Sequence, residues 1–129
     1  MNSASDKHNQ KVGLLGEKIA ADFLKEKGYD ILERNCRYRL GEIDIIAQKN
    51  KITVFVEVKT IISNSDFLPE YHFSRGKINN LLRACYLYLK ERKMSLEEPW
   101  QVDLIAVELD SFLRKKEIRH WANVVEDSW

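Results

Sequence analysis

The segment that most constrains the fold is Gly41–Thr60, "GEIDIIAQKNKITVFVEVKT", in which two apolar runs flank a polar turn. Runs of this length that are rich in Ile and Val predict two β-strands, over about residues 42–48 and 52–60. The intervening "QKNK" contains Asn50, a residue type that is common in tight turns. The segment therefore predicts a β-hairpin.

The remaining elements are predicted from periodicity and turn residues. Apolar residues at helical spacing predict one helix in "GLLGEKIAADFLKEKG", capped by Gly28, and another over about residues 76–92. Short apolar runs predict an edge strand in "YDILERN", a buried strand in "WQVDLIAVEL" and a last strand in "IRHWANVV". Residues 61–74 have no sustained period and contain Pro69, so we expect a loop there. This order predicts an α/β domain with a central mixed β-sheet flanked by helices, in two or three layers.

The length of 129 residues fits one domain. We expect residues 1–11 to form a mobile N-terminal tail, because they offer nothing to bury, and residues 12–129 to form a single domain. No apolar run approaches the roughly 18 residues of a membrane span, and the polar N-terminus does not resemble a signal peptide. Cys36 and Cys85 lack the paired spacing of a zinc site or a disulfide framework. We therefore expect a cytoplasmic protein without membrane contact.

Three charged side chains interrupt the hairpin strands: Asp44 in the first strand, and Glu57 and Lys59 in the second. Because alternate residues of a strand share a face, Glu57 and Lys59 point away from the face formed by the valines, which we expect to be the core side. Two carboxylates that converge from neighbouring strands repel each other unless a cation lies between them. Carboxylate oxygens, together with the main-chain carbonyl of Val58, suit magnesium or manganese. The pattern predicts a divalent metal site.

Lys59 adds a second chemical function to this metal site. A water held by a metal ion is acidic, and a nearby ammonium can orient it and stabilise the negative charge that forms on an attacked phosphate. An acid on one strand followed by E-x-K on the next therefore favours a phosphodiester hydrolase. The alternative is an ordinary amphipathic strand whose outward Glu and Lys pair weakly in water, and E-x-K alone would favour it. Glu17, at the edge of the apolar arc of the first helix, adds to the hydrolase pattern.

The net charge of +1, from 21 basic and 20 acidic residues, favours no class of partner. Locally the balance differs. Three arginines and no acid lie in the segment "RNCRYR", Arg34–Arg39, and six basic residues against one acid lie in Arg75–Lys93. If the fold placed both segments on one side, they would form a cationic face for nucleic acid. The alternative is two separate solvated faces.

The sequence resembles the PD-(D/E)xK nuclease superfamily and, within it, the YraN family of uncharacterised bacterial proteins related to archaeal Holliday junction resolvases. The resemblance rests on "GEKIAADFLKEKGYDILERN", "GEIDIIA", "VFVEVKT" and "VDLIAV", and covers most of the chain after the tail. It implies a resolvase-like core of the restriction-endonuclease type. Three acids around a divalent metal and a lysine beside the attacking water would occupy its four active-site positions, namely Glu17, Asp44, Glu57 and Lys59. Three features depart from the family pattern: Leu40 stands where many relatives have glycine, "PEYHFSRGK" fits the loop poorly, and Trp100 and Gln101 precede Asp103 where an Arg-Phe pair is usual.

The leading hypothesis is a metal-dependent endonuclease that hydrolyses DNA, with branched or structured DNA implied by the resemblance. Asp44, Glu57 and the Val58 carbonyl would hold Mg or Mn, while Glu17 would bind a second ion or orient Lys59. Contacts to the DNA backbone, which give affinity without sequence reading, are assigned to Arg34, Arg37, Arg39 and Lys77. The resemblance also favours a homodimer. The alternative is a catalytically silent module that keeps the nuclease fold and binds nucleic acid or protein.

Overall fold

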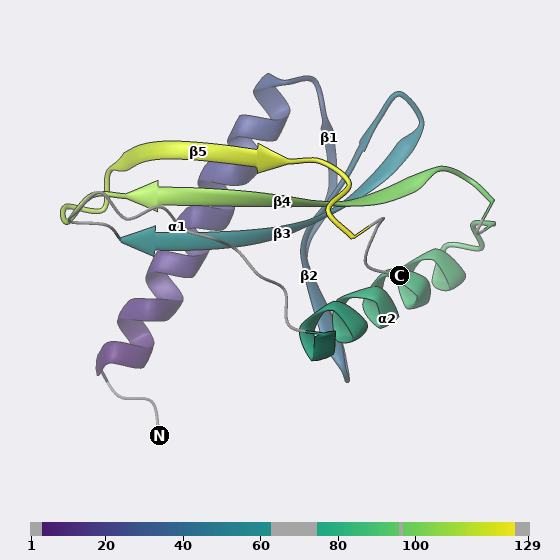
Figure 1. The fold of residues 1–129 in the computed structure, drawn as a ribbon, viewed down its shortest axis with the longest axis horizontal. Helices are drawn as coiled ribbons and strands as arrows, with labels where there is room; N and C mark the ends of the chain where they lie inside the picture. Colours follow the sequence, from purple (N-terminus) through teal and green to yellow (C-terminus); the bar gives the residue numbers. More distant parts are fainter. Residues whose placement is uncertain (1–3, 63–74, 96, 126–129) are drawn as a thin grey trace.

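A computed structural model describes residues 4–62, 75–95 and 97–125 of the chain. It contains two helices and five strands in the order α1 (Ala4–Glu26), β1 (Asp30–Tyr38), β2 (Gly41–Lys49), β3 (Ile52–Ile62), α2 (Arg75–Glu91), β4 (Trp100–Leu109) and β5 (Lys115–Trp121). Figure 1 shows the long strands β3 to β5 side by side, with β1 and β2 crossing them steeply. The loop predicted for residues 61–74 lies outside the described residues, apart from the last two residues of β3.

The five strands form one mixed sheet in the order β1-β2-β3-β4-β5. Neighbouring strands are antiparallel except β3 and β4, which pair in parallel from Thr53↔Trp100 to Ile62↔Leu109. A parallel pair needs a long crossover, and α2 lies in the connection between these two strands. The predicted α/β fold with a mixed central sheet flanked by helices is therefore confirmed, and it is consistent with a resolvase-like core.

The hairpin predicted from the sequence is formed by β2 and β3, which pair from Ile45↔Val56 to Lys49↔Ile52. Its two turn residues, Asn50 and Lys51, both have positive φ, at 52° and 66°. Two consecutive residues in this conformation make a turn whose twist matches that of the flanking strands, and asparagine adopts it at little cost. The predicted turn at "QKNK" is confirmed.

The first helix is longer than predicted. It begins at Ala4, so the described part of the expected tail, residues 4–11, is helical. The earlier start was not predicted because a polar segment shows no apolar period, although it can extend a helix whose later turns are packed. The mobility expected for residues 1–11 stays a prediction. Val12, at the start of the packed part, is buried against the sheet. Within the described ranges, neither α1 nor α2 combines the length and the apolar character that crossing a membrane requires.

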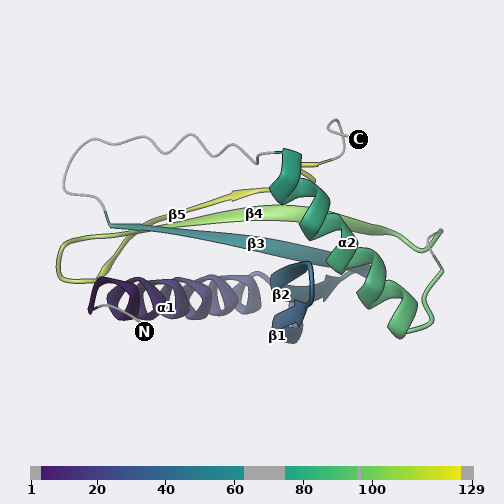
Figure 2. The same cartoon turned by 90° about the horizontal axis from the view of Figure 1, so that it is seen from below.

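The sheet has an apolar core on each face, which gives three layers. One core packs α1 against Val54, Val56 and their neighbours, and the other packs α2 against Phe55 and its neighbours. Figure 1 shows α1 crossing behind β3 to β5 and α2 in front of β2, and Figure 2 gives the same arrangement from below. The expectation that only the valine face of β3 is core was wrong, because α2 buries the Phe55 face as well.

Two strands separate where the charged residues lie. The β2–β3 pairing stops at Ile45↔Val56, whereas β3 continues beside β4 as far as Ile62. Beyond Val56, β3 therefore has a described strand partner on its β4 side alone. Glu57 and Lys59 lie just beyond Val56 in β3, and Asp44 lies just before the part of β2 that pairs with β3. The separation of β2 from β3 opens the sheet at the charged residues.

Candidate active site

The fold brings the four predicted active-site residues into one hollow of about 380 Å³. Glu17 comes from α1, Asp44 from β2, and Glu57 and Lys59 from β3; Val58 and Lys77 also line the hollow. It lies where β2 leaves β3, between the first half of α1 and the start of α2. The four side chains therefore line one hollow, and their role as an active site stays a prediction.

Asp44 is fixed by the main chain of the neighbouring strand. Its Oδ2 accepts a hydrogen bond of 2.8 Å from the Val58 N–H, and the residue is 7% exposed. Since β2 no longer pairs with β3 at this point, the carboxylate takes the place of a strand partner. The hydrogen bond holds Asp44 beside Glu57.

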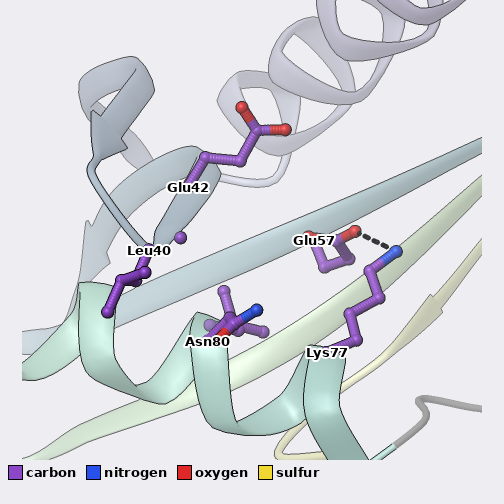
Figure 3. A pocket seen from close by; sticks show the side chains of 7 residues that line it. Leu40, Glu42, Glu57, Lys77 and Asn80 are labelled. Carbon is purple, nitrogen blue, oxygen red and sulfur yellow. Dashed lines mark ion pairs between the residues drawn. The ribbon is translucent and has the colours of Figure 1, made fainter.

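Glu57 forms an ion pair with a lysine of the second helix. Its Oε1 lies 2.9 Å from the Nζ of Lys77, as Figure 3 shows, and Glu57 is 8% exposed. The amines of Lys77 and Lys59 lie near each other, and each shifts the pKa of the other. One buried carboxylate and two lysines are thus gathered within a single contact network.

Glu17 completes the acidic group from the opposite side of the hollow. Asn35 and Asp44 lie near its carboxyl, and both act to lower its pKa against the effect of burial. Among the described residues, its Oε2 atom is buried and has no hydrogen-bond partner. A buried oxygen of this kind is costly unless a donor or a cation approaches it.

The crowding of acids changes their proton affinity. Burial and then the charge of Glu57 raise the pKa of Asp44 to about 8, although the Val58 N–H opposes this shift. Burial also raises the pKa of Glu17. A positive ion among these oxygens would reverse both effects, since a cation favours the ionised carboxylates.

The two lysines shift in opposite directions. Burial, followed by the contact with Lys77, lowers the pKa of Lys59. Burial also acts to lower the pKa of Lys77, yet hydrogen bonds to Lys59 and Glu57 raise it above its usual value. Lys77 therefore keeps its proton more readily than Lys59, which suits Lys59 for handling a proton near the hollow.

The donor chemistry of the hollow fits a divalent cation. Carboxylate oxygens of Glu17, Asp44 and Glu57 face it, and hard ions such as Mg²⁺ prefer oxygen ligands. In the described part of the chain, however, no three side chains of Asp, Glu, His and Cys are already arranged to hold a metal ion. Lys77 engages Glu57, and the Val58 N–H engages Asp44. The oxygens fit the ion by type, but at least Glu57 would have to exchange a partner to bind it.

Residues 16–107 match the profile of a family described as "Uncharacterised protein family UPF0102". The chain belongs to this family. It is 42% identical over 119 residues to the UPF0102 protein of Kosmotoga olearia, which covers 92% of this chain and 96% of the relative. The UPF0102 protein of Alkaliphilus oremlandii is 39% identical over 115 residues, covering 89% and 97%. That of Syntrophomonas wolfei is 49% identical over 82 residues, covering 64% and 71%. The family predicted from the sequence is confirmed, and the nuclease superfamily stays a prediction.

In this member of the UPF0102 family, the site contains two further residues that were not predicted from the sequence. Glu42 lines the central hollow and two neighbouring ones, of about 390 and 400 Å³. Asn35, on β1, lies near the carboxyl of Glu17 and acts to lower its pKa, and it has a φ of 52°. Glu42 lies two residues before Asp44, a spacing that could have signalled it. No sequence signal marks Asn35, because its left-handed backbone occurs within a strand.

The basic residues predicted to bind DNA are only partly gathered around the site. Lys77 lines the central hollow. Arg37 lines the adjacent hollow of about 400 Å³ and lies 3.4 Å from Glu42. Arg34 is exposed on β1, and its charge acts on the carboxyl of Glu17. Arg39 is exposed in the turn between β1 and β2.

Proposed function

We propose that the chain is a metal-dependent endonuclease that hydrolyses phosphodiester bonds of DNA. The observation that carries this proposal is the convergence of Glu17, Asp44, Glu57 and Lys59, from three separate elements, on one hollow. Acids and a lysine from a single strand could be an ordinary surface pattern. Burial of Asp44 and Glu57 beside Glu17 is costly without a function or a counter-ion.

Each residue of the site has a role in this proposal. Asp44, Glu57, the Val58 carbonyl and Glu17 would hold Mg²⁺ or Mn²⁺. When bound, such an ion acidifies water and polarises a phosphate oxygen. Lys59, one step along the same face of β3 from Glu57, donates hydrogen bonds to the attacking water and to the phosphate oxygen that gains charge. Its lowered pKa, caused mainly by burial, helps it to exchange a proton with that water.

The shape of the site supports a strand of nucleic acid as the ligand. The central hollow adjoins one lined by Gln10 and Arg37 and another lined by Lys77 and Asn80, and Glu42 lines all three. Arg37 and Lys77, in the two neighbouring hollows, can contact phosphates on either side of the scissile bond. Arg34 on β1 and Arg39 in the turn after it extend the contact. From the family resemblance we further propose branched or structured DNA as the substrate and a homodimer as the active form. A cytoplasmic location is proposed from the sequence itself, which has no paired cysteine spacing and no long apolar run.

A second candidate is a catalytically silent module that binds nucleic acid. The ion pair between Lys77 and Glu57 favours it, because a lysine engages an oxygen that the metal would need. This candidate predicts DNA binding that weakens with salt, since phosphate contacts release counterions, and no cleavage with any metal.

The two candidates are separated by a cleavage assay. Purified protein is incubated with branched, single-stranded and linear DNA in Mg²⁺, Mn²⁺ or EDTA, beside the variants Glu57→Ala and Lys59→Ala. Glu98→Ala, at an exposed residue far along the chain, is the matched control. We expect cleavage that needs the metal, is unchanged in the control, and falls at least about a hundredfold in both site variants. Cleavage that survives both substitutions, or DNA binding without cleavage by the wild type, would contradict the proposal.

A further inference from the structure

The Lys77–Glu57 ion pair joins a rigid partner to a movable one. Glu57 is held in β3, where it pairs with Leu104 of β4, and its side chain is 10% exposed. Lys77 lies in the first turn of α2, and its side chain is 38% exposed. A lysine ammonium sits on a flexible four-carbon stem. If the pair separates, the lysine is therefore the partner that moves.

Lys77 lies next to a second hollow. The residue lines the central hollow and also the neighbouring hollow that reaches Asn80 and Leu40, which Figure 3 shows from close by. Glu57 lines this second hollow too, so the ion pair lies where the two hollows meet. A phosphate of a strand bound in either hollow would be within reach of the flexible lysine stem.

A divalent cation at Glu57 and the ammonium of Lys77 exclude each other. The Nζ atom is 2.9 Å from Oε1, so an ion on that oxygen would lie in the immediate neighbourhood of a positive charge. The amine of Lys59 lies near Lys77 and also lines the hollow, so it adds to the positive charge there. Like charges at such distances repel strongly in a partly buried site.

We propose that Lys77 is the internal counter-ion of Glu57 in the metal-free protein and exchanges this partner for a DNA phosphate when a divalent cation binds. This inference rests on the proposed function, because it uses the same metal site and the same ligand. It makes Lys77 a positioning residue with two partners. Metal binding and DNA binding are thereby coupled, since each favours the state that the other needs.

Calorimetric titration of Mn²⁺ into the full chain without DNA tests the first half of the exchange. Lys77→Met removes the competing charge, so we expect it to bind Mn²⁺ roughly five- to fiftyfold more tightly than the wild type, the usual range of such couplings. Lys77→Arg keeps the charge and should stay close to the wild type. Lys90→Met, the same change at an exposed position of the same helix, is the control. Unchanged or weaker Mn²⁺ binding by Lys77→Met, or no binding by any form, would overturn the proposal.

Loss of Lys77 leaves Glu57 buried without its partner, and the variant could fail to fold. Lys77→Gln, whose amide still donates a hydrogen bond to Glu57, then takes its place, and circular dichroism checks that each variant is folded. The same tighter binding of Mn²⁺ is expected from it. Weaker binding by a folded Lys77→Gln protein counts against the exchange.

Fluorescence anisotropy with a labelled duplex tests the second half. In EDTA, Lys77 is engaged with Glu57, so we expect wild type and Lys77→Met to bind DNA equally well. In Mn²⁺ at low temperature, with the duplex checked for integrity, the wild type should gain more affinity than the variant. An equal gain in both would contradict the exchange. Neither measurement requires cleavage, so Mn²⁺ and DNA binding as predicted, without any cleavage, would refute the nuclease and leave the exchange intact.

Discussion

Asp44 shows at the residue scale how one side chain links the fold to the site. It replaces a strand partner for the Val58 N–H where β2 ends its pairing, and it stands beside Glu57 and Glu17. The hydrogen bond of Asp44 therefore stabilises the main chain, while its ionised carboxylate is repelled by those of Glu57 and Glu17. Ordinary proteins rarely bury acids in this way without pairing them.

The pKa of Asp44 leads to a prediction on stability. Burial and Glu57 raise this pKa to about 8 from an ordinary value of 3.8, so the folded state holds the proton to higher pH than the unfolded state. Without metal, the free energy of unfolding should therefore fall as the pH rises from about 4 to about 8. Asp44→Asn keeps an oxygen for the Val58 N–H and removes the repulsion. It should raise the free energy of unfolding at pH 8 by on the order of 2 to 5 kcal/mol.

Urea unfolding in EDTA at pH 5, 6, 7 and 8 measures this effect. The advantage of Asp44→Asn over the wild type should grow with pH. Asp30→Asn, at an exposed residue, controls for the loss of a negative charge. A difference between Asp44→Asn and the wild type that is the same at every pH would rule out the explanation.

At the scale of the elements, two glycines allow α1 and α2 to approach the sheet closely. A Cβ on Gly16 would clash with the side chain of Thr60 on β3, and a Cβ on Gly41 would clash with the main-chain carbonyl of Asn80 on α2. Gly16 directly precedes Glu17, and Gly41 lies three residues before Asp44. Both close contacts therefore set the positions of acids in the hollow. The sequence showed the glycines but could not show which partner each one meets.

The two glycines of α1 give a matched pair of substitutions. Gly13 has open space around its Cβ position, so Gly13→Ala should stabilise the helix by about 0.5 to 1 kcal/mol. Gly16→Ala makes the same change one turn later, and the contact with Thr60 should cost about 1 to 3 kcal/mol. Thermal unfolding of both variants measures the contrast. Equal effects of the two substitutions would show that α1 does not approach β3 as closely as described.

At the scale of the whole molecule, much of the fold was predictable from the sequence, because apolar periodicity and turn residues are local signals. The hairpin, its Asn50 turn, the buried strand β4 and the helix α2 all follow from such signals, and the structure confirms them. The start of α1 and the second core face of β3 did not follow, since both depend on packing between elements distant in sequence. The separation of β2 from β3, which opens the hollow, also depends on that packing.

The same distinction applies to the site as a whole. Glu57 and Lys59 were recognisable from their spacing on one strand, and Asp44 from its place on the partner strand. The ion pair of Glu57 with Lys77 and the contact of Glu17 with Asn35 join segments that no spacing connects. The sequence therefore predicted the chemical groups of the site better than their partners.

Acids from α1, β2 and β3 line one hollow, and we propose that a divalent cation belongs among them. Calorimetric titration of Mn²⁺ into the wild type and Asp44→Ala tests this directly. We expect saturable binding of Mn²⁺ by the wild type and a loss of at least about tenfold in affinity in Asp44→Ala. Equal affinity of the two proteins, or no binding by the folded wild type, would contradict this proposal.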